Sequence, residues 1–195
     1  MKNLYKTGLV IGRFQPIHKG HEFIIKQALT LCNKVYVYIG SSQESNTWRN
    51  PFSFDLRKEL ISKVFSKEVR KKRLIIKPLA DIGVGDTLEW GQYVMDTIRT
   101  DLWKGFDPSN HEDIDLYVTG CEKARASWFS NAITPNMSEL RVARKNLEIA
   151  DLSGRACRKT LMDEDFYLWC CLVPKALGNY KYYCKLKEIY KNVKG

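Results

Sequence analysis

Apolar positions along the chain alternate between short strand-like runs and longer stretches with helical spacing. Four runs are rich in strand-forming residues, and a weaker fifth follows them: Thr7–Ile11, Lys34–Ile39, Arg73–Leu79, Ile114–Thr119 and Leu140–Ala143. Three stretches repeat apolar residues every three or four positions, as an amphipathic helix does: His21–Cys32, Phe54–Phe65 and Thr87–Trp103. A shorter helix is expected between the last two strands. This alternation predicts an α/β fold, a Rossmann-like doubly wound parallel sheet with helices on both faces.

The pattern changes after residue 152. Ser153 and Gly154 have the character of a helix start, because a serine side chain can cap the first N–H groups of a helix. Tyr180–Val193 has the apolar spacing of a last amphipathic helix. We therefore expect one domain over residues 1–195, with a Rossmann-like core over 1–152 and a small C-terminal helical extension over 153–195.

Composition limits the partners and the location. The formal net charge is +10, with basic runs at residues 67–73 and 181–194. Neither run accompanies a nucleic-acid-binding motif, so we expect a solvated basic surface, a site for a polyanionic small molecule, and no nucleic acid as partner. No apolar run approaches the roughly 20 residues of a membrane helix. No secretory signal is visible, so the sequence favours a cytoplasmic protein without membrane contact.

The six cysteines lack a metal-binding spacing. No two of them are separated by two residues, and the chain contains only three histidines to complete a zinc site. Scattered cysteines in a cytosolic chain are usually reduced packing residues. We therefore expect reduced cysteines and no zinc site.

Three of the strand-like runs end at a glycine: Gly12, Gly40 and Gly120. Ligands of open parallel sheets bind outside the carboxyl ends of the strands. Glycine allows the backbone to turn sharply there and allows a ligand to approach closely. We therefore expect the binding site at this edge of the sheet.

The segment Gly12–His21 joins the first strand to the first helix and reads Gly-Arg-Phe-Gln-Pro-Ile-His-Lys-Gly-His. A helix start presents backbone N–H groups and the positive end of the helix dipole, which attract phosphate. His18 and His21 are three residues apart and can face the same side of that start. Gly20 leaves room between them, and Arg13 adds a cationic fork. The segment therefore predicts a triphosphate site.

A second segment, Leu152–Lys159, also combines a helix start with positive charge. Ser153 would cap this helix, and Arg155 and Arg158 lie in its first turns. Such a start can hold the β- and γ-phosphates that leave as pyrophosphate. Basic residues on a helix are usually solvated, so this segment alone is weak evidence for a phosphate site. The prediction made for the histidine segment supports it.

Together these segments resemble the nicotinamide mononucleotide (NMN) adenylyltransferases, in the archaeal-type branch of the HxGH nucleotidyltransferase superfamily. The resemblance spans most of residues 6–162 and is carried by these segments: Gly12–His21, Gly40–Gln43, Trp48–Ser53, Arg57–Ile61, Pro78–Ile82, Trp90, Thr119–Lys123 and Ser153–Arg158. It implies an enzyme that transfers the adenylyl group of ATP to NMN, giving NAD and pyrophosphate.

The resemblance also implies roles for individual residues. Four would be catalytic, binding the ATP phosphates and stabilising the transition state: His18, His21, Arg13 and Arg158. The other ATP-binding residues would be Gly12, Phe14, Gly20, Gly120, Ser153 and Arg155, and the NMN-binding residues Asp81, Trp90 and Arg49, with the Trp90 ring stacked on the nicotinamide. Magnesium (Mg2+) would accompany ATP, held mostly by its phosphates. Relatives of this kind often form homo-oligomers, and the sequence leaves the oligomeric state open.

Two departures from the family pattern bear on the acceptor and on catalysis. Arg155 stands where the family's last motif has threonine. The loop between Asp81 and Trp90 is longer than expected and contains no asparagine to read the carboxamide. Two alternatives therefore stay open: an adenylyltransferase for another phosphorylated acceptor, such as phosphopantetheine, and a nucleotide-binding regulator without catalysis. The preference between NMN and its carboxylate analogue also stays open.

Overall fold

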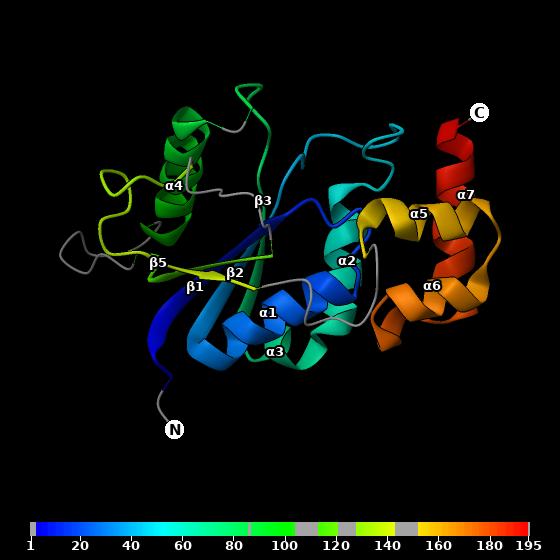
Figure 1. Ribbon diagram of the computed structural model, residues 1–195, viewed down its shortest axis with the longest axis horizontal. Helices are drawn as coiled ribbons and strands as arrows, with labels where there is room; N and C mark the ends of the chain where they lie inside the picture. The colour runs from blue at the N-terminus through cyan, green and yellow to red at the C-terminus, as the bar shows by residue number, and fades with distance from the viewer. Residues whose placement is uncertain (1–2, 86, 104–112, 121–127, 143–151, 195) are drawn as a thin grey trace.

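The five strands form one parallel sheet. The computed structural model describes residues 3–85, 87–103, 113–120, 128–142 and 152–194. The strands are β1 (Tyr5–Gly12), β2 (Cys32–Ile39), β3 (Leu74–Pro78), β4 (Leu116–Thr119) and β5 (Ser138–Arg141), and all neighbours are parallel in the order β3-β2-β1-β4-β5 (Figure 1). This order confirms the predicted Rossmann-like, doubly wound sheet. The order reverses between β1 and β4, and sheets of this kind bind ligands at the carboxyl ends beside such a reversal.

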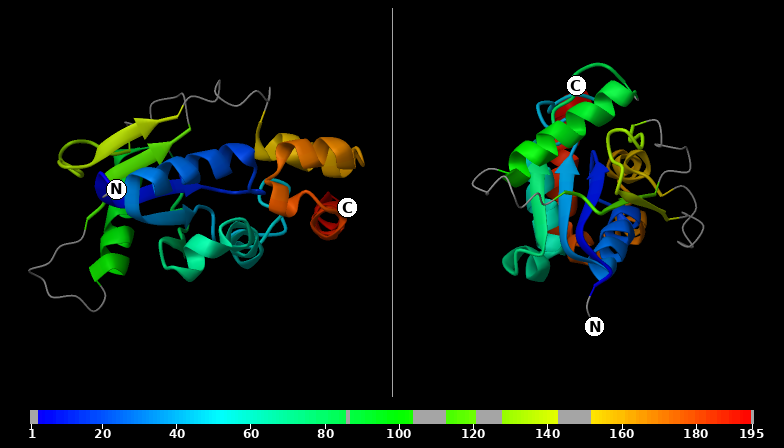
Figure 2. Two further views of the ribbon diagram at one scale, coloured as in Figure 1. Left: turned by 90° about the horizontal axis from the view of Figure 1, so that it is seen from below. Right: turned by 90° about the vertical axis from the view of Figure 1, so that its left-hand side faces the viewer.

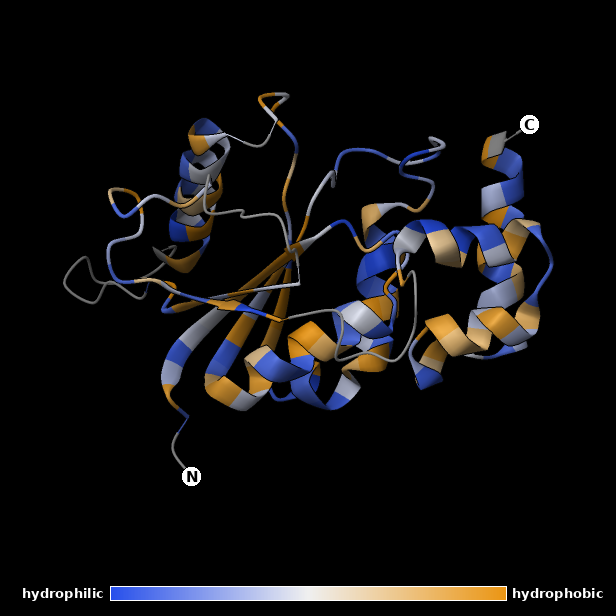
Figure 3. Cartoon of the chain, in the orientation of Figure 1, coloured by the Kyte–Doolittle hydropathy of each residue, from blue (hydrophilic) through white to orange (hydrophobic). Residues whose placement is uncertain are grey.

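The two faces of the sheet carry separate cores, because successive side chains of a strand point to opposite faces. In β2, Val35, Val37 and Ile39 belong to one cluster, and Tyr36 and Tyr38 belong to the other. Helices α1 (Lys19–Leu31) and α2 (Phe54–Val64) pack into the first cluster, and α4 (Leu88–Trp103) packs into the second. Thus α1 and α4 lie on opposite sides of the strands (Figure 2), and Figure 3 shows the apolar residues concentrated on the central strands.

Helical segments follow residue 152: α5 (Gly154–Met162), α6 (Phe166–Leu172), a 3₁₀ turn (Lys175–Leu177) and α7 (Tyr180–Lys194). They lie on the right of Figure 1, on the side of the sheet to which β1 points. Trp169 of α6 is fully buried and donates from Nε1 to the carbonyl of Leu177 at 3.2 Å. Residues of α5–α7 share one core cluster with the first face of the sheet. On this shared core we propose a single domain over residues 1–195.

The predicted strands and the longer predicted helices are present, with shifted ends. α1 begins at Lys19 rather than His21, because His18 is its N-cap. β4 begins at Leu116, later than predicted, and β5 covers Ser138–Arg141 rather than residues 140–143. α5 begins as predicted, with its cap at residue 153.

The sequence pattern did not predict two short helices, α3 (Ser66–Arg70) and α6. The shorter helix expected before β5 falls partly on residues 121–127, which lie outside the described ranges, and residues 128–137 form turns and loops. Across the described parts of the chain, no helix combines the length and the apolar character needed to cross a membrane.

The buried thiols are expected to resist alkylation. Five of the six cysteines are described and are free thiols, and Cys121 lies outside the described ranges. Burial raises the pKa of Cys32 to about 11 and that of Cys157 to about 12, whereas Cys184 is exposed. The thiolate is the reactive form. Iodoacetamide at mildly alkaline pH should therefore modify Cys184 in the folded protein and reach Cys32 and Cys157 only after unfolding, as mass spectrometry of the peptides would show. Equal labelling of all three would contradict the described burial.

Candidate active site

The buried side chain of Gln15 helps to fix the loop between β1 and α1. The amide of Gln15 accepts from the backbone N–H of Phe52 and donates to the carbonyl of the same residue, both at 3.0 Å. The neighbouring Phe14 is buried and adopts a left-handed backbone with φ of 51°. These contacts give the loop a fixed course from Gly12 to the start of α1.

His18 and His21 lie together in the first turn of α1. His18 is the buried N-cap, and His21 is half-buried. Their rings stack with centroids 3.7 Å apart, and the Phe14 ring lies 4.6 Å from that of His21. The backbone N–H of His18 donates to Nδ1 of His21 at 3.4 Å. Because Nδ1 accepts this bond, the ring proton of neutral His21 is on Nε2, which is then a hydrogen-bond donor.

Two glycines let the loop and the rings approach each other. A Cβ on Gly20 would lie 3.0 Å from the His18 ring. A Cβ on Gly12 would lie 3.2 Å from the Phe14 ring and 3.6 Å from Nε2 of His21. A side chain at either position would therefore push against the aromatic groups at the helix start.

The first turn of α5 meets the same loop. Ser153 caps α5 by accepting from the N–H of Ala156 at 3.1 Å, as the sequence predicted. A Cβ on Gly154 would lie 2.8 Å from the carbonyl oxygen of Gln15, and Nη1 of Arg158 donates to that oxygen at 2.6 Å. The starts of α1 and α5 therefore flank one loop, and the positive ends of both helix dipoles lie near each other.

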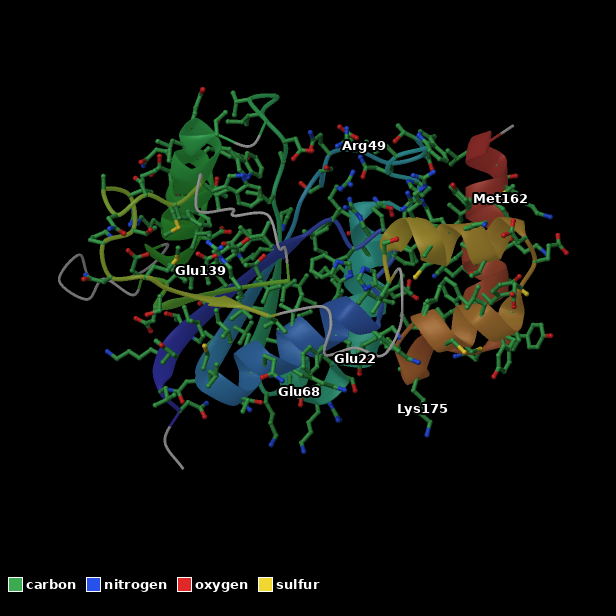
Figure 4. All side chains as sticks on the ribbon, viewed as in Figure 1. Glu22, Arg49, Glu68, Glu139, Met162 and Lys175 are labelled. Carbon is green, nitrogen blue, oxygen red and sulfur yellow. The ribbon has the colours of Figure 1, made fainter. Side chains whose placement is uncertain are left out.

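Three arginines predicted to hold phosphate are exposed. Arg13 follows β1, and Arg155 lies in the first turn of α5. Arg49 lies on the long loop between β2 and α2, as Figure 4 shows. Exposed guanidinium groups can turn toward an anionic ligand without disturbing the core.

The loops after β2 and β3 are joined around Asp81. Its carboxylate accepts a hydrogen bond from Oγ of Ser41. The Gln43 amide donates to the Asp81 carbonyl at 3.2 Å and accepts from the Asp81 N–H at 3.0 Å. Farther along the loop, the buried Asn50 donates to the carboxylate of Glu44. The exposed carboxyl group of Asp81 therefore has a fixed place at the carboxyl edge of the sheet.

Two other residues of the predicted site are closely packed. Trp90 is 7% exposed in the second core cluster, with its ring 5.4 Å from Tyr93 and edge-on to Trp128 at 6.0 Å. A Cβ on Gly120, at the end of β4, would lie 2.5 Å from Cδ1 of Ile24. The fold thus brings the histidine segment and the start of α5 together, while Trp90 packs from α4 into the second core cluster. Stacking of Trp90 on a nicotinamide ring stays a prediction.

Sequence reasoning assigned no role to Arg57 of α2. This side chain is fully buried, and burial lowers the pKa of its guanidinium to about 10. The sequence held a signal, since Arg57 precedes Leu60 and Ile61 by three and four residues and so lies on the apolar face of the predicted helix. A charged group in such a position is stable only with hydrogen-bond partners.

Comparison with known proteins gives sequence matches that each cover somewhat less than half of the chain. The sequence profile of the cytidylyltransferase-like family matches residues 9–89. A nicotinamide-nucleotide adenylyltransferase of Thermococcus kodakarensis is 34% identical over 96 residues, which are 49% of this chain and 50% of that protein. One of Saccharolobus solfataricus is 40% identical over 89 residues, 45% of this chain and 50% of that protein. The chain spans about half the length of the curated relatives it matches.

The likeness of fold extends over nearly the whole chain. A bifunctional NMN adenylyltransferase/ADP ribose pyrophosphatase from Francisella tularensis has a TM-score of 0.70 at 24% identity, covering 96% of this chain and 52% of that chain. A structure of such a Francisella protein complexed with AMP and a manganese ion has a TM-score of 0.68 at 23% identity, covering 97% and 52%. Over residues 9–89, the chain is similar to the cytidylyltransferase-like family.

Proposed function

We propose that the chain is an adenylyltransferase that transfers the adenylyl group of ATP to NMN, giving NAD and pyrophosphate. The observation that carries the proposal is the meeting of the starts of α1 and α5 at one loop, with His21 on one side and Arg158 on the other. Two helix starts, one carrying a histidine N–H donor and the other a cationic arginine, suit a chain of phosphates. The curated relatives, matched over about half of the chain, are named nicotinamide-nucleotide adenylyltransferases, which supports NMN as the acceptor.

The proposed reaction needs positioning and charge stabilisation rather than a protein nucleophile. A phosphate oxygen of NMN attacks the α-phosphorus of ATP, a new P–O bond forms, and the bond to the bridging oxygen breaks so that pyrophosphate leaves. Holding both substrates in line makes the step effectively unimolecular. In this proposal, Nε2 of His21 donates to a phosphate oxygen on which negative charge grows, and the stacked His18 keeps that ring in place.

The leaving phosphates would lie against α5. In this proposal Arg158 holds the outer phosphates from the start of α5, and the exposed Arg13 and Arg155 neutralise further charge. Among the residues that the structure describes, no group of three or more His, Cys, Asp or Glu side chains could hold a metal ion. In this proposal a divalent cation enters as part of the MgATP substrate, with phosphate oxygens as its main ligands. The Francisella structure with AMP and manganese supports a divalent cation in such folds.

The acceptor would lie beside the loops that follow β2 and β3. Arg49 would hold the phosphate of NMN, and Asp81, fixed by Ser41, would stand near the nicotinamide nucleoside. The adenosine would lie near Gly120 at the end of β4, next to the point where the strand order reverses.

An acceptor screen tests the proposed function. The protein is incubated with MgATP and one acceptor at a time, namely NMN, nicotinate mononucleotide or phosphopantetheine, and pyrophosphate release is measured. The proposal expects pyrophosphate and NAD in equal amounts with NMN. ATP binding without pyrophosphate release from any acceptor would identify a non-catalytic nucleotide-binding protein instead.

Replacing Trp90 by alanine tests the acceptor half of the site. If the ring stacks on nicotinamide, the KM for NMN should rise about tenfold, because stacking on a base contributes about 1–3 kcal/mol, while the KM for ATP changes less. Trp90→Phe is the control, because it keeps an aromatic ring in the core. Equal rises of both KM values in the alanine variant would assign Trp90 to packing alone.

Adenylyl transfer to another phosphorylated acceptor is the second candidate. The burial of Trp90 between Tyr93 and Trp128 favours it, because a ring packed in the core is less available to stack on a base. In the acceptor screen this candidate predicts pyrophosphate release with phosphopantetheine and little with NMN.

A further inference from the structure

We infer that Arg57 is a positioning residue that holds the two substrate loops in one geometry. The ATP loop comprises residues 12–18, between β1 and α1, and the acceptor loop comprises residues 40–53, between β2 and α2. The inference rests on the proposed function, which assigns a substrate to each loop. Arg57 itself is fully buried in α2 and is a positioning residue, not a catalytic one.

The Arg57 guanidinium donates four hydrogen bonds, all to backbone carbonyls. Nη1 bonds the carbonyl of Arg13 in the ATP loop at 3.0 Å and that of Gly40 in the acceptor loop at 2.8 Å. Nη2 bonds the carbonyl of Ser41 at 3.0 Å, and Nε bonds that of Ser53 at 3.2 Å. One cation therefore joins the carboxyl ends of β1 and β2 to the start of α2.

Two of these carbonyls precede residues with a left-handed backbone. Phe14, with φ of 51°, follows Arg13, and Ser41, with φ of 48°, follows Gly40. This conformation is unfavourable for residues other than glycine, because Cβ crowds the backbone. Nη1 of Arg57 bonds the carbonyl before each of them, and so it fixes the peptide unit on which each left-handed turn depends.

The same bonds set the direction of the backbone amides. In a trans peptide unit, the carbonyl and the following N–H point in opposite directions. The carbonyls of Arg13 and Gly40 point at Arg57, so the N–H groups of Phe14 and Ser41 point away from it. The next peptide unit of the acceptor loop shows the same opposition. Its carbonyl, that of Ser41, accepts from Nη2 of Arg57, and its N–H, that of Ser42, donates to the carbonyl of Leu79 at 3.1 Å.

Each left-handed residue contacts one half of the proposed site. The ring of Phe14 lies 4.6 Å from the ring of His21, and Oγ of Ser41 donates to the carboxylate of Asp81. A shift of either peptide unit would therefore move a group proposed to act on ATP or on the acceptor. Both peptide units bond the same nitrogen of Arg57, so this side chain couples their positions.

Lysine cannot reproduce this arrangement. A guanidinium offers five N–H donors in a planar fork, whereas an ammonium is a point charge with three donors around one atom. Arg57→Lys keeps the charge and loses the simultaneous reach to four carbonyls. Misplacement of reacting groups by about 1 Å can lower turnover about 10²-fold, so we expect a loss of roughly that size in kcat for this variant, with both KM values raised.

The control must separate positioning from stability. Ile61 is fully buried on the same helix and carries no polar group, so Ile61→Ala weakens the same core without touching the carbonyls. Both variants are assayed well below their unfolding temperatures. The inference predicts near-normal kcat for Ile61→Ala and a large loss for Arg57→Lys. Equal losses in the two variants, or near-normal turnover by Arg57→Lys, would overturn it.

A binding measurement keeps this test independent of the reaction. ATP is titrated calorimetrically without acceptor. Its affinity should be about tenfold lower for Arg57→Lys than for the parent protein, a difference of about 1.4 kcal/mol, because the ATP loop is one of the two loops that Arg57 holds. The affinity of Ile61→Ala for ATP should be nearly that of the parent. A parent protein that binds ATP but makes no NAD would refute the proposed function and leave this comparison valid.

A measurement on the unaltered protein serves where Arg57→Lys does not fold. The guanidinium hydrogens of Arg57 are followed by NMR while ATP alone and then NMN alone are added. The inference predicts that each ligand shifts the Arg57 resonances, because each loop bonds the same group. A response to neither ligand would refute the joining role.

Discussion

Replacing His21 by alanine is expected to lower turnover of ATP and NMN by about 10²–10³-fold, the usual effect of removing one donor that stabilises transition-state charge. The variant loses Nε2, the ring nitrogen that carries a proton because Nδ1 accepts from the backbone of His18. It also leaves the His18 ring without its stacking partner at 3.7 Å. Steady-state kinetics with both substrates measures the change, and circular dichroism checks that α1 persists.

Lys26→Ala is the matched control for His21→Ala. Lys26 lies on the exposed side of the same helix and pairs with Glu22 at 2.6 Å. Exposed pairs of this kind contribute little to stability, about 0.2–1 kcal/mol, so turnover should stay near the parent value. His18→Ala should also lose activity, through the missing ring. Near-normal rates in both histidine variants would show that the pair takes no part in catalysis.

Replacing Gly91 by alanine is expected to give the largest loss of stability. Gly91 lies in α4, and a Cβ there would overlap the backbone carbonyl of Trp128 and lie 3.0 Å from its Cα. Backbone cannot swing aside as the end of a side chain can, so α4 must move away from the segment it packs against. Overpacking of a core typically destabilises by about 1–3 kcal/mol, and we expect a value at or above the upper end.

Urea unfolding of Gly91→Ala and of Gln92→Ala measures this effect. Gln92 is the exposed neighbour of Gly91 on the same helix, and alanine favours helix at an exposed position. Gln92→Ala should therefore unfold near the parent midpoint and Gly91→Ala at a clearly lower urea concentration. Coincident transitions of the two variants would contradict the close packing of α4 on Trp128.

The order of strands and helices could be predicted because it is a local property of the sequence. The apolar period differs between the runs that form β1–β4 and those that form α1, α2 and α4, and glycine marks three strand ends. The predicted position of β5 was wrong by two residues. The strand is short and mostly exposed, so its sequence shows only a weak alternation of apolar and polar residues. The helix α3 has five residues and none of them buried, so it shows no amphipathic period.

The candidate site was predictable where its parts are adjacent in sequence. His18 and His21 belong to one turn, and the cap at Ser153 is read from the serine and the helix that follows. Contacts between distant segments were not predictable. The Gln15–Phe52 pair joins residues 37 apart, and Arg57 reaches Arg13 across 44 positions. Such contacts depend on how the pairing of β1 with β2 brings the loops after these strands together. The local pattern of a single sequence does not show which distant residues then meet.

The most direct test follows the imidazole nitrogens by NMR while ATP is added. The chain has only three histidines, His18, His21 and His111, so each ring can be assigned by single replacements. We expect MgATP to shift the Nε2 signal of His21 strongly and to shift His18 with it. Unchanged signals from both His18 and His21 at saturating ATP would contradict the claim that the start of α1 binds the phosphates.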